Sequence, residues 1–186
     1  MRVVMVRENL ENIPEYAVPA GFSLRWYQPG DEAHWLRIHL LADRDSRIMP
    51  DLFVRRFGSD PILLVRRQCY LLDQHGEAIG TGTAWFDDRF EGARFGRVHY
   101  VAIVPEYQGR GLSKPLMTVI CQRLRQLGHD RAYLATSIAR MAAINLYRHF
   151  GFLPRIRSAE EATAWRALRP REPVAGLPFG REGQRF

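Results

Sequence analysis

A glycine-containing segment, VPEYQGRGLSKPLM at residues 104–117, carries the residue types in this chain best suited to chemistry. Glycine allows successive backbone N–H groups to point in one direction, and a helix N-terminus adds about half a positive charge. A turn of this kind binds phosphate groups without a metal ion. Because Arg110 and Lys114 can add positive charge at its edge, the segment predicts a phosphate-binding turn. A plain glycine-rich turn between a strand and a helix is the alternative interpretation.

Two common phosphate-binding patterns do not fit this segment. A P-loop needs a lysine directly after its last glycine and then a hydroxyl residue, but here Lys114 follows Ser113 and Pro115 comes next. The dinucleotide-binding pattern needs a third glycine where Lys114 stands. The hexapeptide from Gln108 to Ser113 instead fits the pattern Q-x-x-G-x-[G/A], with serine in the last place.

The turn must be positioned by a strand before it and a helix after it. Residues 96–104, GRVHYVAIV, are nearly all apolar and β-branched, which is typical of a central, buried strand. The residues after the turn have the spacing of an amphipathic helix that ends at Gly128. The apolar face of this helix is expected to consist of Leu112, Leu116, Val119, Ile120, Leu124 and Leu127.

Alternation and helical spacing predict further elements on both sides of this unit. The expected strands are a short one at residues 3–6, then 22–27, the two arms of a hairpin over 69–86, 131–137 and 152–157. The expected helices are 31–41, with Trp35, Ile38 and Leu41 on one face, then 50–58, 141–150, and a last one that begins with a capping box at Ser158. We expect one domain over residues 21–169, an N-terminal extension at 1–20 and a flexible C-terminal tail at 170–186.

The composition is that of a globular protein, with 186 residues of which 46% are hydrophobic and 25% charged. No apolar run reaches the roughly 18 residues of a membrane helix, and the N-terminal residues are too acidic for a signal peptide. Cys69 and Cys121 are isolated, which predicts neither disulfides nor a metal site and fits the cytoplasm. The histidines likewise predict no metal site, because His34 and His39 do not share a helix face. His129 and His149 are expected at the surface.

The net charge of +7 and the sequence pI of about 10.0 are high enough to raise the question of an RNA partner. Lys114 is the single lysine among the 27 cationic residues, so the others are arginines. These arginines are scattered along the chain, with no run of five or six. We therefore favour a solvated basic surface, with RNA binding as the alternative.

The stretch YVAIVPEYQGRGLSKPLM, followed later by AAINLYRHFGF, resembles the GNAT family of acetyl-coenzyme A-dependent N-acetyltransferases over residues 22 to 157. The resemblance implies an α/β fold with a central mixed, mainly antiparallel sheet of six to seven strands, flanked by helices on both faces. Counted from residues 22–27, its fourth and fifth strands would splay apart. Pantetheine would lie in that gap, on the backbone of Val101, Ala102 and Ile103. The other residues implied at the cofactor are Gln108, Gly109, Arg110, Gly111, Leu112, Ser113, Lys114, Arg140 and Asn145.

Acetyl transfer to an amine needs a neutral amine and gains from protonation of the departing thiolate. Tyr147 matches the tyrosine that the family uses to protonate the coenzyme A sulfur; a core aromatic residue is the alternative. His99 is the candidate base, because strand alternation places it with Arg97 and Val101 on the face where several relatives carry a Glu or His. A buried structural histidine is the alternative for His99.

Two positions differ from the ribosomal-protein N-terminal acetyltransferases of this family. Ala135 stands where that subgroup has a glutamate, which argues against a ribosomal-protein acceptor. Arg140 stands where the subgroup has an asparagine that contacts coenzyme A, although an arginine can still reach a phosphate. The acceptor is therefore left open by the resemblance.

The resemblance implies transfer of an acetyl group from acetyl-coenzyme A to a primary amine of a small molecule or a protein. Direct attack in a ternary complex fits the lack of a Cys-His or Ser-His-Asp pattern in the sequence. Two alternatives remain. One is an enzyme acting on RNA-borne amines such as aminoacyl-tRNA, which the basic pI motivates; the other is a non-catalytic acyl-coenzyme A sensor without a base. The expected assembly is a monomer or a homodimer.

Overall fold

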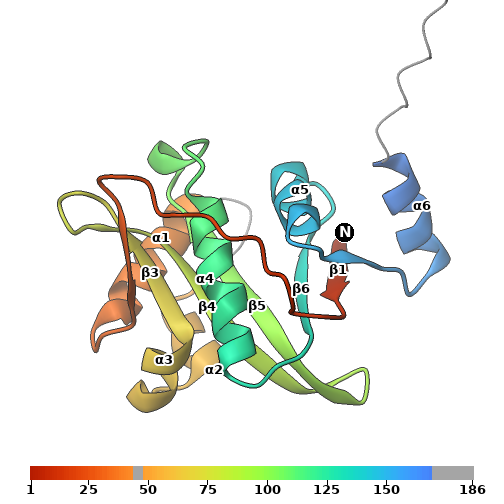
Figure 1. Cartoon of the computed structure of the whole chain (residues 1–186), viewed down its shortest axis with the longest axis horizontal. Helices are drawn as coiled ribbons and strands as arrows, with labels where there is room; N and C mark the ends of the chain where they lie inside the picture. Colours follow the sequence, from red (N-terminus) through yellow and green to blue (C-terminus); the bar gives the residue numbers. More distant parts are fainter. Residues whose placement is uncertain (44–47, 169–186) are drawn as a thin grey trace, which may run out of the picture. The chain divides into compact units, whose positions relative to one another are not determined.

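Apolar and β-branched runs form seven strands in the computed structural model, which describes residues 1–43 and 48–168 (Figure 1). The strands are β1 Arg2–Arg7, β2 Ser23–Trp26, β3 Gln68–Leu72, β4 Ala78–Phe90, β5 Ala93–Ile103, β6 Ala132–Ser137 and β7 Leu153–Arg155. They form one sheet in the order β2-β3-β4-β5-β6-β1-β7. Strands β5 and β6 pair in parallel and the other neighbours are antiparallel. The prediction of a mixed, mainly antiparallel sheet is confirmed.

Helices lie on both faces of this sheet, as expected. The helices are α1 Asp31–Ala42, α2 Leu52–Phe57, α3 Pro61–Arg67, the 3-10 helix η1 Pro105–Tyr107, α4 Ser113–Gln126, α5 Met141–His149 and α6 Ala159–Ala167. Helix α4 crosses one face of β3, β4 and β5, and α1 packs against the other face of β4 and β5 (Figure 1). The sequence interpretation missed α3, which begins at Pro61 after the Asp60 side chain accepts a hydrogen bond from the Ile62 amide at 2.9 Å.

The apolar face of α4 fixes the helix against the sheet. Leu112, Leu116, Ile120 and Leu124 are at most 1% exposed, whereas Val119 and Leu127 are half-buried. A Cβ atom added at Gly82 would lie 3.3 Å from Ile120 Cγ1, so the helix comes close to the strand at this glycine. Each buried leucine contributes about 1.5–3 kcal/mol. The glycine turn at the N-terminus of α4 is therefore held by a well-packed helix.

The opposite face of the sheet carries an aromatic layer. Trp35 of α1 packs edge-to-face on Phe57 of α2 at 5.7 Å and on Tyr100 of β5 at 5.0 Å. Trp35 and Ile38 are fully buried as expected, but the expectation for Leu41 is wrong, since this side chain is 41% exposed. His39 takes the buried position instead, because a residue four after Trp35 lies above it on the same helix face.

The chain divides into two compact units, Met1–Arg155 and Ile156–Phe186. In the first unit, the short strand expected at residues 3–6 is β1, which pairs with both β6 and β7, so this part of the expected extension is a strand of the sheet. In the second unit, Ser158 Oγ caps α6 by accepting from the Glu161 amide at 3.1 Å. The expected tail at 170–186 lies outside the described residues. None of the described helices is long and apolar enough to cross a membrane.

Candidate active site

A β-bulge at Tyr100 changes the direction of the side chains on β5. Thr83 of β4 pairs with His99 and Thr81 pairs with Ala102, so Tyr100 and Val101 together stand opposite Gly82. Tyr100 has a φ of 48°, which is rare for a residue other than glycine. The expectation that His99 and Val101 share a face is therefore wrong. Val101 lies toward α4, next to Ile120 and Gly82, whereas His99 lies toward α2 with its ring 5.7 Å from that of Phe57.

Strands β5 and β6 separate after Arg97. Their paired residues are Gly96 with Ala132 and Arg97 with Tyr133, and no pairing follows along the rest of β5. Counted from β2, β5 and β6 are the fourth and fifth strands, which are the ones expected to splay, and the edge of β5 that faces the gap includes Val101, Ala102 and Ile103. The gap is thus bordered by strand backbone that β6 does not pair with.

The glycine turn follows directly from this edge. Gln108 Nε2 donates to the Ile103 carbonyl at 2.8 Å, which ties the turn to the end of β5. Gly109 and Gly111 have φ values of 76° and 78°, a conformation that L-residues rarely adopt. Within the described residues, the amides from 109 to 112 donate to no protein acceptor, and α4 has no side-chain cap. The turn therefore presents a row of unused N–H donors at a helix N-terminus, which suits an anion.

The side chains of the turn have distinct roles. Leu112 is 1% exposed and belongs to the core, so only its backbone can face a ligand. Ser113 is half-buried and begins α4. Arg110 and Lys114 are exposed and lie over the rings of Tyr107 and Tyr16, at 4.8 and 5.0 Å from the ring centroids. Both cationic side chains are therefore exposed next to the turn.

Tyr147 lies on α5, the helix that follows β6. Its side chain is half-buried, and burial raises its pKa to about 12, with Arg140 acting in the opposite direction. The hydroxyl group therefore keeps its proton at neutral pH. Asn145 is exposed on the same helix. Arg140, at the N-cap of α5, forms an ion pair with Asp43 at 2.7 Å, so its guanidinium is already engaged by a carboxylate.

His99 is half-buried on the aromatic side of the sheet. Burial holds its pKa well below the usual range, and Arg97, Arg56, Arg2 and His39 lower it further. The imidazole is therefore neutral at neutral pH, with a ring nitrogen that can accept a hydrogen bond. No hydrogen bond or ring contact joins His99 to Tyr147 among the described residues.

His39 is a buried histidine that the sequence interpretation set aside. It is 4% exposed, its ring lies 4.2 Å from that of Trp35, and its Nε2 atom has no hydrogen-bond partner in the described part of the chain. Burial lowers its pKa to about 4, although Asp43 acts to raise it. Its i, i+4 spacing from Trp35 is the signal that could have predicted this position. Across residues 1–43 and 48–168, no group of three His, Cys, Asp or Glu side chains could hold a metal.

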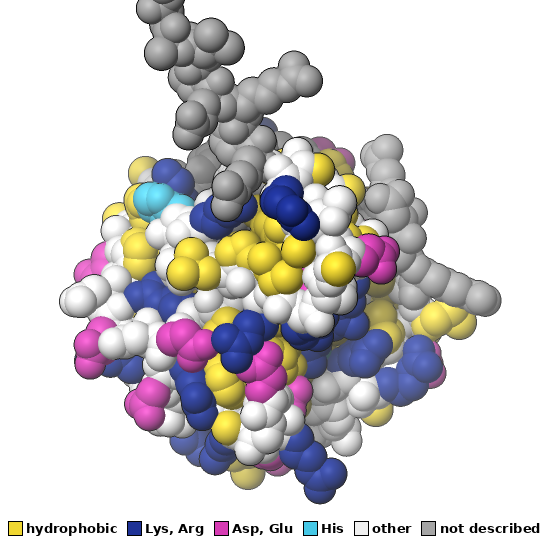
Figure 2. Space-filling model, turned by 90° about the vertical axis from the view of Figure 1, so that its right-hand side faces the viewer, with side chains coloured by type: hydrophobic (Ala, Val, Ile, Leu, Met, Phe, Trp, Pro, Cys, Tyr) yellow, Lys and Arg dark blue, Asp and Glu magenta, His cyan; other side chains and the backbone are white. Residues whose placement is uncertain are grey.

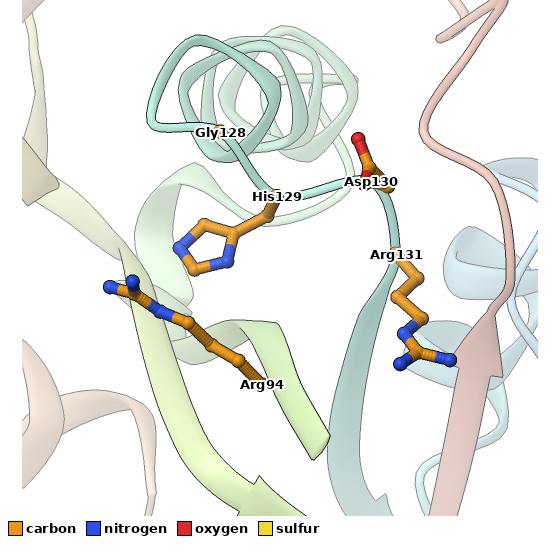
Figure 3. Close-up of a pocket in the computed structure, with 5 residues that line it drawn as sticks. All are labelled: Arg94, Gly128, His129, Asp130 and Arg131. Atoms are coloured by element: carbon orange, nitrogen blue, oxygen red, sulfur yellow. The ribbon is translucent and has the colours of Figure 1, made fainter.

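A hollow of about 460 Å³ lies at the other end of α4. It is lined by Arg94, Gly128, His129, Asp130 and Arg131 (Figure 3). The His129 ring lies beside Arg94, and the Arg131 side chain points away from both. His129 is 4% exposed, so the expectation that it lies at the surface is wrong. Because α4 has 14 residues, the hollow is about 20 Å from the glycine turn and does not belong to the candidate site.

Comparison with known proteins agrees with this geometry. A sequence model described as the acetyltransferase (GNAT) family matches residues 24–152. Mycothiol acetyltransferase of Salinispora tropica is 32% identical over 147 residues, which are 75% of this chain and 47% of that protein. The corresponding protein of Streptomyces coelicolor is 31% identical over 76% of this chain and 46% of its own length. The chain thus spans slightly less than half the length of these relatives.

Solved structures share the fold at lower identity. A GCN5-related N-acetyltransferase from Sphaerobacter thermophilus has a TM-score of 0.67 and 19% identity, over 83% of this chain and 48% of that one. The ribosomal-protein-S18-alanine N-acetyltransferase from Escherichia coli has a TM-score of 0.58 and 19% identity, over 73% of this chain and 79% of that one. These structures share the fold of the chain, and the family model covers both the glycine turn and α5. The chain therefore belongs to the acetyltransferase (GNAT) family.

Proposed function

We propose that the chain is an N-acetyltransferase that moves an acetyl group from acetyl-coenzyme A to a primary amine by direct attack in a ternary complex. One observation carries the proposal. The amides of residues 109–112 have no acceptor among the described residues, and they continue directly from the β5 edge that β6 leaves unpaired. A ligand with a pyrophosphate and a long polar chain fits such an arrangement, and coenzyme A has both.

The residues present fit acetyl-coenzyme A, which supplies the acetyl group as a thioester. The amides of residues 109–112 would hold its pyrophosphate, with Arg110 and Lys114 adding charge at the rim, whereas the Lys114 amide already donates to the Gly111 carbonyl at 3.3 Å. The backbone of Val101, Ala102 and Ile103 would bind the pantetheine chain. Asn145 is exposed on α5, so its side chain is free to contact the cofactor. Arg140 would have to break its ion pair with Asp43 in order to bind a phosphate.

Tyr147 and His99 are proposed as the two proton-transfer residues. The neutral imidazole of His99 takes the proton of the ammonium group, directly or through water. The Tyr147 hydroxyl, protonated at neutral pH, donates toward the departing sulfur. Neither cysteine suits a covalent route, because both are buried and burial raises the pKa of Cys69 and of Cys121 to about 12. These thiols stay protonated, which supports direct attack.

The acceptor is proposed to be an amine of a small molecule or a protein, and the cytoplasm the location. The relatives are named for mycothiol, but they are about twice as long, so their acceptor is not assigned to this chain. One observation argues against an RNA-borne acceptor. On the face in Figure 2, Lys and Arg side chains are dispersed among acidic and hydrophobic ones. A monomer or a homodimer is equally compatible with the proposal.

An acceptor screen with thiol detection tests the proposed function. The chain is incubated with acetyl-coenzyme A and a panel of primary amines, peptides and aminoacyl-tRNA, and free coenzyme A is measured. We expect thiol release that depends on the amine. Cofactor binding without thiol release for any acceptor would indicate the sensor instead. Release with aminoacyl-tRNA alone would favour the RNA-directed enzyme.

A further inference from the structure

Arg97 and Arg2 lie on the sheet face that carries His99. Arg97 pairs with Tyr133 of β6, and its guanidinium lies 5.3 Å from the Tyr133 ring centroid. Ser137 is four residues after Tyr133 on β6, so the two side chains lie on the same face of the sheet. Arg2 of β1 pairs with Ser137 and therefore lies on this face as well. Arg97 belongs to the last residue pair of β5 and β6, and Arg2 belongs to β1, the strand on the other side of β6. Figure 1 shows these three strands side by side. Two arginines from different strands therefore lie on the face that carries His99, with Arg97 at the start of the gap and Arg2 across β6 from it.

A third arginine comes from α2, which covers this face. Phe57 of α2 lies 5.7 Å from the His99 ring and 5.3 Å from the Trp85 ring, so the helix is packed over β4 and β5. Arg56 is the preceding residue and is exposed. The pKa of His99 is lowered by burial and then by Arg97, Arg56 and Arg2, so all three charges act at this ring.

None of these three arginines forms an ion pair in the described part of the chain. Eight ion pairs form among residues 1–43 and 48–168, and none includes Arg2, Arg56 or Arg97. The nearby carboxylate of Asp87 accepts a hydrogen bond from the Tyr133 hydroxyl at 2.8 Å. Arg97 Nε is buried and donates to no protein acceptor. A buried guanidinium N–H without an acceptor is costly, and an anion would satisfy it.

We propose, on the basis of the proposed function, that the acceptor is an amine whose other end carries a carboxylate or a phosphate, and that Arg97, with Arg56 and Arg2, binds this anionic end. The arrangement gives the site two kinds of selectivity. His99 accepts a proton from the amine, while the arginines draw in the anion and disfavour acceptors with a second cationic group. Arg97 is the main determinant because it is half-buried, whereas Arg56 and Arg2 are exposed and screened by solvent.

Three small amines with the same two-carbon spacing test the proposal: ethanolamine, β-alanine and phosphoethanolamine. The value of kcat/KM is measured for each by thiol release. We expect the better of the two anionic amines to exceed ethanolamine by at least about tenfold, the scale of a hydrogen bond to a charged group. Whether β-alanine or phosphoethanolamine is preferred identifies carboxylate or phosphate as the bound group.

Variants assign the preference to the arginines. Arg97→Gln should bring the ratio of anionic to neutral amine close to one, and Arg97→Lys should keep part of it. Arg56→Gln, at an exposed position, should lower the ratio less. The matched control is Arg94→Gln, which removes an arginine from the far end of β5 and should leave the ratio unchanged. The melting temperature of each variant is measured to check that it is folded.

Equal kcat/KM for the three amines in the wild type, or an unchanged ratio in both Arg97→Gln and Arg56→Gln, overturns the proposal and leaves the acetyltransferase assignment in place. If no amine is acetylated, the proposed function fails, and calorimetry with phosphoethanolamine and β-alanine then decides on the anion site. Binding that Arg97→Gln abolishes supports the site. Absence of binding to the folded wild type overturns it.

Discussion

Replacing Tyr147 with phenylalanine removes one hydroxyl group from the candidate site and leaves the ring in place. Burial raises the pKa of Tyr147 to about 12, whereas a thiol has a reference pKa of about 8.5. The difference of about 3.5 units makes complete proton transfer to the thiolate uphill by about 5 kcal/mol. The hydroxyl is therefore expected to act mainly as a hydrogen-bond donor to the departing sulfur.

The size of the effect follows from this role. A hydrogen bond to a charged group contributes about 1.5–3 kcal/mol, which corresponds to a rate loss of roughly 10- to 150-fold. Tyr147→Phe should therefore lower kcat by this factor, with little change in acetyl-coenzyme A affinity. Since the pKa of Tyr147 is about 12, its ionisation should produce no limb in the pH–rate profile of the wild type below about pH 10.

The assay is thiol release under single-turnover conditions, so that product release does not hide the chemical step. Tyr27→Phe is a matched control, because burial also raises the pKa of Tyr27 to about 12 and its hydroxyl donates to Glu32, away from the glycine turn. A Tyr147→Phe rate within a factor of two of the wild type would remove this residue from the mechanism. An equal loss in the control would point to a general effect on folding.

Three other variants test the rest of the site. Gly111→Glu should abolish acetyl-coenzyme A binding in calorimetry, because the new carboxylate faces the pyrophosphate. The control Gly92→Glu changes a turn glycine with the same φ of 78° and should still bind acetyl-coenzyme A. Equal binding by both variants would place the phosphate site elsewhere. His99→Gln should lower the rate and remove a pH–rate limb below about pH 6.5, whereas a lower melting temperature with an unchanged profile would make His99 structural. His39 has a folded-state pKa of about 4, so the wild type should lose roughly 3 kcal/mol of unfolding free energy as the pH falls from 6.5 to 4. Chemical unfolding of His39→Phe should show a flatter pH dependence. An equally steep dependence in this variant would show that the loss does not come from His39.

The glycine turn and its flanking strand and helix could be predicted because their signals are local. Apolar runs, glycine positions and the spacing of Leu112, Leu116, Ile120 and Leu124 lie within a few residues of each other in the sequence. The resemblance to a family then supplied the splayed sheet, which no local pattern indicates.

The bulge at Tyr100 could not be predicted, and it changed the candidate site. Alternation along β5 assumes one residue per position, but a left-handed conformation at Tyr100 costs about 1–2 kcal/mol and depends on distant contacts. Its ring packs on Trp35 and Phe57 at 5.0 and 5.7 Å, which holds it in place. These partners are far from Tyr100 in the sequence.

The cluster of Arg2, Arg56 and Arg97 was hidden for the same reason. Arg2 reaches this face only because β1 pairs with β6, and Arg56 only because α2 packs over β4 and β5. In the sequence these residues are part of a scattered set of arginines. Their common surroundings arise from non-local strand pairing and helix packing.

The most direct test of the central claim is an initial-rate measurement in which acetyl-coenzyme A and an accepted amine are both varied. Direct attack in a ternary complex predicts double-reciprocal lines that intersect, thiol release only when the amine is present, and one N-acetylated product for each thiol released. Parallel lines, or an acetylated form of the protein detected by mass spectrometry in the absence of amine, would contradict the account.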